Sequence, residues 1–256
     1  MSSERILQTK NLGITFDGLV ALEGVDFTAE QGDITAIIGP NGAGKTTFFN
    51  LIAGFYTPTA GSVEYLGTDI TRLKPFQRTD AGIARTFQNI NLFRDMSVMD
   101  NALVGLHCHG KSGVVANMLR TPGQRREEKR LRDEVMQSLE FLGLADYANE
   151  KAGSLSYGMQ KNLEIARALA SRPKVLLLDE PASGLNTQDL DELSRRILKI
   201  RDRGIAVVLI EHKMDVVMSI SDKIMVLNFG KKIAAGTPDE IKSNHEVIEA
   251  YLGKED

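Results

Sequence analysis

The stretch that most constrains this chain is a glycine-rich one, which reads Gly39-Pro40-Asn41-Gly42-Ala43-Gly44-Lys45-Thr46-Thr47. It matches the phosphate-binding loop pattern G-x-x-x-x-G-K-[ST] at every fixed position. The five residues before it, 34–38, are mostly apolar and rich in isoleucine, which is typical of a buried strand. The residues after it, 48–53, favour a helix that ends at Gly54. The sequence therefore predicts a strand, a glycine turn and a helix, the arrangement that binds a phosphate.

The residue types in this loop suit the chemistry of a nucleotide. Backbone N–H groups and the positive end of the helix dipole converge on one point. Glycines 39, 42 and 44 allow a positive φ and a close approach of the backbone to the ligand. Lys45 can reach the β- and γ-phosphates, and the Thr46 hydroxyl can bind Mg²⁺. The alternative, a glycine-rich turn that matches by chance, is disfavoured by the strand and helix on either side.

Composition and charge narrow the class of protein. The chain has 256 residues, 42% hydrophobic and 25% charged, which is ordinary for a soluble globular protein. A net charge of −3 argues against a nucleic-acid partner bound through overall basicity. The apolar run 205–210 is too short to span a membrane, and Cys108 as the single cysteine fits a reducing compartment. We expect a cytoplasmic protein that reaches a membrane only through partners.

The pattern of strands and helices predicts an α/β fold. Residues 6–9, 12–16 and 19–22 are predicted as short strands, with turns at Lys10-Asn11 and Asp17-Gly18, in an antiparallel sheet beside the loop. Further strands at 61–66, 83–87, 175–178, 205–210 and 224–227 are separated by helical patterns. One helix is predicted from about Ser156 to Ser171. Strands that alternate with helices predict a mostly parallel sheet.

Polar side chains follow two of these strands directly. Asp179 and Glu180 end the strand 175–178, and His212 comes just after the strand 205–210. Open α/β sheets place their ligands at the carboxyl ends of the strands. Asp179 can hold Mg²⁺ through a water, and Glu180 can accept a proton from the water that attacks a γ-phosphate. The alternatives are an acidic pair that caps a helix before Pro181 and a histidine with a structural role only.

Three further features admit two interpretations. Phe16 could stack on a purine or face the core. His107-Cys108-His109 suggests a metal, but adjacent side chains converge poorly and no second ligand cluster follows. The charged run 120–134 carries six basic and four acidic residues, and we interpret it as a solvated face rather than a site for lipid headgroups.

A second helix start narrows the function to fewer proteins than the phosphate-loop NTPases in general. Leu155-Ser156-Tyr157-Gly158-Met159-Gln160 places a serine and a glycine at the beginning of a long predicted helix, which is another anion site. One active site has little need for a second such helix. Two copies arranged head to tail would use it, with each helix start closing the nucleotide of its partner.

With these motifs in order, the sequence resembles the ATP-binding cassette (ABC) family over essentially its whole length. The resemblance implies one cassette over 1–256, with a core and antiparallel β subdomain (1–88 and 171–256) and an α-helical subdomain (89–170). It implies that Phe16 stacks on adenine and that loop 39–47 holds ATP or ADP. It implies that Thr46 and Asp179 serve Mg²⁺, and that Gln88 contacts Mg²⁺ or the attacking water and senses the membrane partner. The resemblance also implies that Glu180 is the catalytic base and that His212 contacts the γ-phosphate. Ser156 and Gly158 would bind the ATP of a partner subunit, and residues 183–186 would cross the dimer interface.

The sequence departs from the usual family pattern at three places. Tyr157 stands where glycine is usual, Met159 where glutamine is usual, and Asn186 replaces a common aspartate. Ser156 and Gly158, the pair that faces the phosphate, are retained. The departures therefore concern the detailed geometry of the helix start and one contact across the dimer interface, and the expected function is kept.

Finer stretches resemble the ATPase subunits of branched-chain amino-acid importers, among them 82–88, 163–169, 210–214 and 247–253. This implies permease partners in the membrane, a second ATPase subunit, an indirect link to a substrate-binding protein, and a peripheral location on the cytoplasmic face of the inner membrane. Alternatives are the ATPase of a lipopolysaccharide exporter, a soluble cassette ATPase, and a phosphate-loop kinase that acts on a small molecule. The kinase would not need Ser156 or Gly158.

Overall fold

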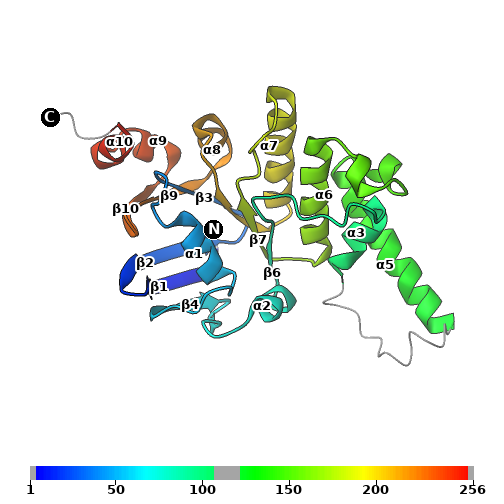
Figure 1. Ribbon diagram of the computed structural model, residues 1–256, viewed down its shortest axis with the longest axis horizontal. Helices are drawn as coiled ribbons and strands as arrows, with labels where there is room; N and C mark the ends of the chain where they lie inside the picture. Colours follow the sequence, from blue (N-terminus) through cyan, green and yellow to red (C-terminus); the bar gives the residue numbers. More distant parts are fainter. Residues whose placement is uncertain (1–3, 107–121, 253–256) are drawn as a thin grey trace. The chain divides into compact units, whose positions relative to one another are not determined.

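The computed structural model of the chain describes residues 4–106 and 122–252 (Figure 1). The chain divides into two compact units, of which the first contains Met1–Gln88 and Lys174–Asp256 and the second Asn89–Pro173. The helical segment predicted at 89–170 falls within the second unit.

An antiparallel sheet opens the first unit, with the strand order β2-β1-β4-β5 among the described residues. Its strands are β1 (Arg5–Phe16), β2 (Leu19–Glu30), β4 (Ala60–Tyr65) and β5 (Thr68–Asp69). Positive φ values at Asp17 and Gly18 form the tight turn predicted between β1 and β2. The predicted turn at Lys10-Asn11 is wrong, because β1 is continuous there. Asn11 instead adopts φ 48° beside a register shift, so the turn-like residue forms a bulge.

The second sheet of this unit has the order β10-β9-β3-β8-β7-β6 in the described chain, and its strands lie side by side in Figure 1. The strands are β3 (Ile34–Ile38), β6 (Ile83–Arg85), β7 (Val175–Asp179), β8 (Ala206–Ile210), β9 (Lys223–Asn228) and β10 (Lys231–Gly236). All pairs are parallel except β10 with β9. Every residue of β3, β7 and β8 is buried, as expected for strands covered on both faces.

Helices of the first unit connect these strands. They are α1 (Lys45–Ile52), α2 (Pro75–Ala81), α7 (Thr187–Arg201), α8 (Met214–Ile220), α9 (Pro238–Lys242) and α10 (His245–Leu252). A buried arginine fixes the end of α1: Arg78 donates to the carbonyl oxygens of Leu51 (2.7 Å) and Ile52 (2.8 Å). It thereby satisfies carbonyl groups that a helix end leaves without partners.

The second unit is helical in its described residues. It contains α3 (Val98–Val104), α5 (Pro122–Phe141) and α6 (Tyr157–Ala170), with short 3₁₀ turns at Ala145–Tyr147 and Ala152–Ser154. Glu164 on α6 is buried, and burial raises the pKa of its carboxyl, while its oxygen accepts the Asn91 amide at 2.9 Å. Within the described residues, no helix is both long and apolar enough to cross a membrane.

Candidate nucleotide-binding site

The glycine-rich loop lies between β3 and α1, as the sequence predicts. A Cβ on Gly39 would lie 2.1 Å from the Leu227 carbonyl oxygen, and one on Gly44 would lie 2.8 Å from the Leu22 side chain. Both glycines also have a positive φ, so no other residue fits without strain. No side chain caps the start of α1, where Gly44 is left-handed. The first backbone N–H groups of α1 are therefore not taken by a side-chain cap, and they can bind an anion.

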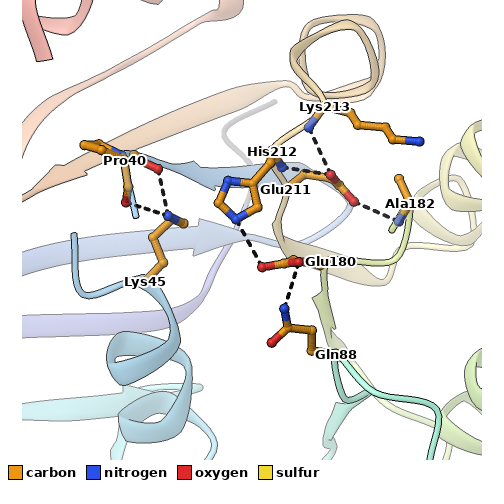
Figure 2. Close-up of polar contacts among 9 residues, drawn as sticks. Pro40, Lys45, Gln88, Glu180, Ala182, Glu211, His212 and Lys213 are labelled. Atoms are coloured by element: carbon orange, nitrogen blue, oxygen red, sulfur yellow. Dashed lines mark hydrogen bonds and ion pairs between the residues drawn. The ribbon is translucent and has the colours of Figure 1, made fainter. Parts of the chain in front are cut away.

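Lys45 is the first residue of α1 and is buried. Its ammonium donates to the carbonyl oxygens of Gly39 (2.7 Å) and Pro40 (2.9 Å) (Figure 2). Burial lowers the pKa of Lys45, and the negative charge of Glu180 partly opposes that shift. The cation thus lies against its own loop with a carboxylate near by, and the Thr46 side chain next to it is exposed.

An open cleft of ≈ 500 Å³ adjoins the loop. Its lining joins loop residues 41–47 to three side chains predicted from the sequence: Gln88, Glu180 and His212. The start of β2 and the turn between β9 and β10 complete the lining. Phe16 is not among the lining residues. Its ring packs edge-on against Tyr56, with 5.2 Å between the centroids, at the end of β1 next to the turn that leads to Leu19.

Glu180 is held between two polar side chains at the end of β7. One carboxylate oxygen lies 3.1 Å from His212 Nε2, and the other accepts Gln88 Nε2 at 3.0 Å (Figure 2). Its backbone has φ 48°, which is uncommon for a residue with a side chain. Such backbone conformations cluster at functional sites. The carboxylate therefore lies in the cleft with a fixed orientation, as a general base requires.

Asp179 has different surroundings from its neighbour. It is buried and forms an ion pair with Arg85, whose Nη2 lies 2.8 Å from the carboxylate. The same guanidinium donates to Asn50 Oδ1 at 2.6 Å. Asp179 is not among the residues that line the cleft. Of the three residues predicted to serve a metal, Thr46 and Gln88 line the cleft, and Asp179 could contribute only through a water or after release from Arg85.

Magnesium is a hard cation that prefers oxygen ligands and usually keeps several waters. The Thr46 hydroxyl and the Gln88 amide oxygen supply two such donors at the cleft, so the residues fit a hydrated Mg²⁺ held with a phosphate. Among the described residues there is no group of three or more His, Cys, Asp or Glu side chains that could hold a metal without a phosphate. The metal considered at His107-Cys108-His109 lies outside the described residues.

Sequence reasoning missed a third carboxylate, Glu211. It is buried at the end of β8, and one oxygen accepts the Ala182 amide at 2.8 Å. The other accepts the amides of His212 (2.8 Å) and Lys213 (3.1 Å) (Figure 2). Glu211 thus joins the segment after Glu180 to the segment that carries His212. A charged residue directly between a wholly apolar strand and a histidine was the signal that could have identified it.

The second predicted anion site lies at the start of α6 in the second unit. Ser156 is the N-cap, and its Oγ accepts the Met159 amide at 3.4 Å. Tyr157 is exposed, with the Lys161 ammonium 6.0 Å from its ring centroid. At Met159 it is the backbone amide that bonds to Ser156, a contact that any residue type other than proline can make. The unusual residues at these two positions therefore leave the helix start intact.

The third departure from the usual pattern also has a structural explanation. Asn186 is the N-cap of α7: its Oδ1 accepts the Asp189 amide at 2.9 Å, and its Nδ2 donates to the Asp189 carboxylate at 2.8 Å. Asparagine and aspartate serve about equally well at this position. The replacement of a common aspartate by Asn186 therefore preserves the cap.

The chain is similar to known proteins over most of its length. A family described as "ABC transporter" matches residues 22–183, and one described as "Branched-chain amino acid ATP-binding cassette transporter" matches residues 231–256. The chain is 44% identical over 253 residues to the high-affinity branched-chain amino acid transport ATP-binding protein BraF of Pseudomonas aeruginosa, which covers 98% of this chain and 99% of the relative.

The fold is also similar to those of solved ATP-binding cassettes. An ATP-binding cassette of an ABC transporter in its ADP conformation is similar with a TM-score of 0.86 and 34% identity, over 98% of this chain and 100% of the other. A dimeric cassette in a post-hydrolysis state bound to ADP and phosphate matches with a TM-score of 0.76 and 25% identity, over 91% of this chain and 99% of the other. Together with the phosphate loop, the Glu180 cleft and the serine-capped α6, these matches show that the chain belongs to the ATP-binding cassette family of ABC transporter ATPases.

Proposed function

We propose that this protein is the ATP-hydrolysing subunit of a membrane importer for branched-chain amino acids. The observation that carries the proposal is the cleft itself, in which the phosphate loop, Glu180, His212 and Gln88 meet. The relatives are named for branched-chain amino-acid transport, which supports the choice of cargo. Other subunits would contact the transported molecule. The cleft therefore supports only the proposed ATPase activity, and the names of the relatives support the proposed cargo.

The geometry supports a division of work among the cleft residues. The N–H groups of loop 41–47 and the Lys45 ammonium bind the phosphates, and the loop carbonyls that hold Lys45 keep it at the cleft. Mg²⁺, with Thr46 and Gln88 as protein ligands, would neutralise charge on the transferred phosphoryl group. Glu180 accepts the proton of the attacking water. His212, bonded to Glu180, is placed to contact the γ-phosphate.

We further propose that the working form pairs this chain with a second ATPase subunit, either another copy or a related chain. Ser156 and Gly158 at the start of α6 would bind the γ-phosphate of the partner's ATP, so that ATP binding closes the pair and hydrolysis reopens it. The matched dimeric cassette supports this arrangement. The permeases would hold the pair at the cytoplasmic face of the membrane and transmit its motion, and a substrate-binding protein would act through them.

The test is a pull-down of tagged Glu180→Gln protein with Mg-ATP from solubilised native membranes, with partners identified by mass spectrometry. We expect two hydrophobic permeases and a second ATPase subunit, because the variant holds ATP and stays closed. Permeases recovered with an outer-membrane bridge would instead identify a lipopolysaccharide exporter. Ribosomes or nucleic-acid proteins without a membrane subunit would overturn the transport function. Wild-type protein with ADP serves as the control for contacts that do not depend on the closed state.

A further inference from the structure

Arg85, the last residue of β6, connects two elements that form the nucleotide site. Its side chain is only 8% exposed. Its Nη2 lies 2.8 Å from the Asp179 carboxylate at the end of β7, and its Nη1 donates to Asn50 Oδ1 of α1 at 2.6 Å. Neither Arg85 nor Asp179 lines the cleft. The guanidinium therefore joins the helix that follows the phosphate loop to the strand that ends at Asp179.

Three aromatic rings lie around the same guanidinium. The Arg85 Cζ lies 5.5 Å from the ring centroids of Phe55 and Phe87 and 5.6 Å from that of Phe49. A cation over an aromatic face is attracted by the negative charge of that face, so the rings stabilise the guanidinium in this position. Phe49 is buried, whereas Phe55 and Phe87 are exposed. The rings give the cation a favourable position that does not depend on Asp179.

The hydrogen bonds of this guanidinium are incomplete. The Arg85 Nε is buried and has no hydrogen-bond partner among the described residues, which is rare for a buried donor. Arg78, by contrast, uses Nε, Nη1 and Nη2 to bind the backbone carbonyl oxygens around it. Arg85 is thus bonded less fully than Arg78. We infer that its ion pair with Asp179 is the easier of the two arrangements to exchange for another.

Asp179 can pair with the guanidinium or serve a metal, but each use weakens the other. A cation next to a carboxylate offsets its negative charge, and two cations that share one carboxylate repel each other. Thr46 and Gln88, the other residues that we expect to serve Mg²⁺, line the cleft, whereas the Asp179 carboxylate is bound to Arg85. Arg85 therefore competes with Mg²⁺ for this carboxylate.

We propose that Arg85 is a positioning residue that holds Asp179 away from the cleft and thereby lowers the affinity of the site for Mg²⁺, and that Asp179 leaves the guanidinium when Mg-ATP binds. The proposal rests on the proposed Mg-ATP site of this cleft. Arg85 touches no reacting atom and acts only through Asp179. Its loss should strengthen metal binding, whereas the loss of a purely structural ion pair would leave metal binding unchanged or weaken it.

The first test measures metal affinity in the full-length Glu180→Gln background, which keeps the ATP unhydrolysed. Mn²⁺ is titrated into the ATP complex and followed by EPR, with protein in excess so that little ATP is free. Arg85→Gln should lower the Kd for Mn²⁺ at least about threefold, because it removes a positive charge beside the carboxylate. Arg85→Lys keeps the charge and should stay within about twofold of the parent. Arg196→Gln is the matched control, since Arg196 pairs with Glu192 on α7.

The second test uses the same background without a substitution at Arg85, so it remains decisive if thermal unfolding shows that Arg85→Gln does not fold. The NMR signal of the Arg85 Nε–H group, identified by its absence in Arg85→Lys, should shift when Mg²⁺ is added to the ATP complex. The corresponding signal of Arg78 should not shift, because Arg78 is bonded to backbone carbonyl oxygens. An unchanged Arg85 signal at saturating Mg²⁺ would contradict the release of Asp179.

Asp179→Asn separates the role of Arg85 from the metal site itself. This variant should raise the Kd for Mn²⁺ at least about threefold, and Arg85→Gln should have a smaller effect when added to it, because the two residues act through one interaction. If folded Arg85→Gln has an unchanged or higher Kd, Arg85 is only a structural partner of Asp179, and the nucleotide site stands. If the parent complex binds Mn²⁺ no more tightly than free ATP does, the proposed metal site is wrong, and the role of Arg85 fails with it.

Discussion

Two helix starts in this protein are built for anions in different ways. Helix α1 follows a left-handed glycine and has no side-chain cap, and a buried lysine is its first residue. Helix α6 follows Ser156, whose hydroxyl accepts the Met159 amide at 3.4 Å, a long and exposed contact. The α1 start thus leaves its amides to a ligand at all times, whereas the α6 start has a weak cap of its own that a ligand can replace.

The surroundings of the two starts differ as much as their caps. The α1 start opens into a cleft with Gln88 and with Glu180 and His212, two side chains that can move a proton. The first turn of α6 contains no acidic residue, and the polar side chains near it are those of Ser156, Tyr157, Gln160 and Lys161. We therefore expect the α1 start to bind a nucleotide next to groups that can react with it, and the α6 start only to bind an anion.

The largest expected effect follows from Glu180→Gln. The amide cannot accept the proton of the attacking water, so kcat for ATP should fall about 10²- to 10⁴-fold while ATP still binds. Steady-state hydrolysis and calorimetry of nucleotide binding measure the two separately. Glu192→Gln, on an exposed turn of α7, is the matched control. If Glu180→Gln hydrolysed ATP at the wild-type rate, Glu180 would not be the general base.

A smaller loss should follow from Ser156→Ala at the other helix start. If this hydroxyl binds the partner's γ-phosphate, hydrolysis should fall at least tenfold, the order of a hydrogen bond to a charged group. Ser154→Ala removes an exposed hydroxyl that bonds to the Lys151 carbonyl in the same unit and should leave hydrolysis unchanged. An unaffected Ser156→Ala variant would instead favour a phosphate-loop kinase.

Glu211→Gln should have a still smaller effect, on the order of tenfold or less in kcat/KM. One carboxylate oxygen accepts one backbone amide and the other accepts two, so an NH₂ group must face a backbone donor in either orientation. The segments that carry Glu180 and His212 then lose a hydrogen bond to the carboxylate that joins them. Steady-state kinetics measures the fall in kcat/KM, and thermal unfolding measures the change in stability. An activity equal to wild type would show that the β8 carboxylate does not position the site.

The smallest effect is expected at a third helix start, which is a purely structural cap. Asn186→Ala should destabilise the protein by about 1 kcal/mol, whereas Asn186→Asp should be nearly neutral because both side chains accept the Asp189 amide. Chemical denaturation measures both. If Asn186→Asp changed ATP hydrolysis rather than stability, the residue would belong to the interface and not only to the cap.

The parts of this protein that are local in sequence were predictable. The strand, loop and helix around Lys45 follow from residue types within a single stretch, and Ser156 was predicted at the start of its helix. The turn at Asn11 could not be excluded, because an asparagine with positive φ fits a turn and a bulge equally well.

Contacts between distant segments were not predictable. The side chains of Asp179 and Glu180 are adjacent in sequence, but Arg85 holds only the first of them away from the cleft. The hydrogen bond from the Ala182 amide to Glu211 depends on how the strands pack. Strand β10 and helix α10 were also missed as elements, because short segments carry too little periodicity to identify them.

The central claim is that the two helix starts serve different nucleotides, α1 its own and α6 that of a partner. The most direct measurement is the Mg-ATP affinity of dilute Lys45→Ala and Ser156→Ala proteins, by calorimetry on the isolated chain. We expect Lys45→Ala to lose binding and Ser156→Ala to bind ATP as wild type does. Equal loss of affinity in both variants would place Ser156 on the nucleotide of its own chain and contradict the account.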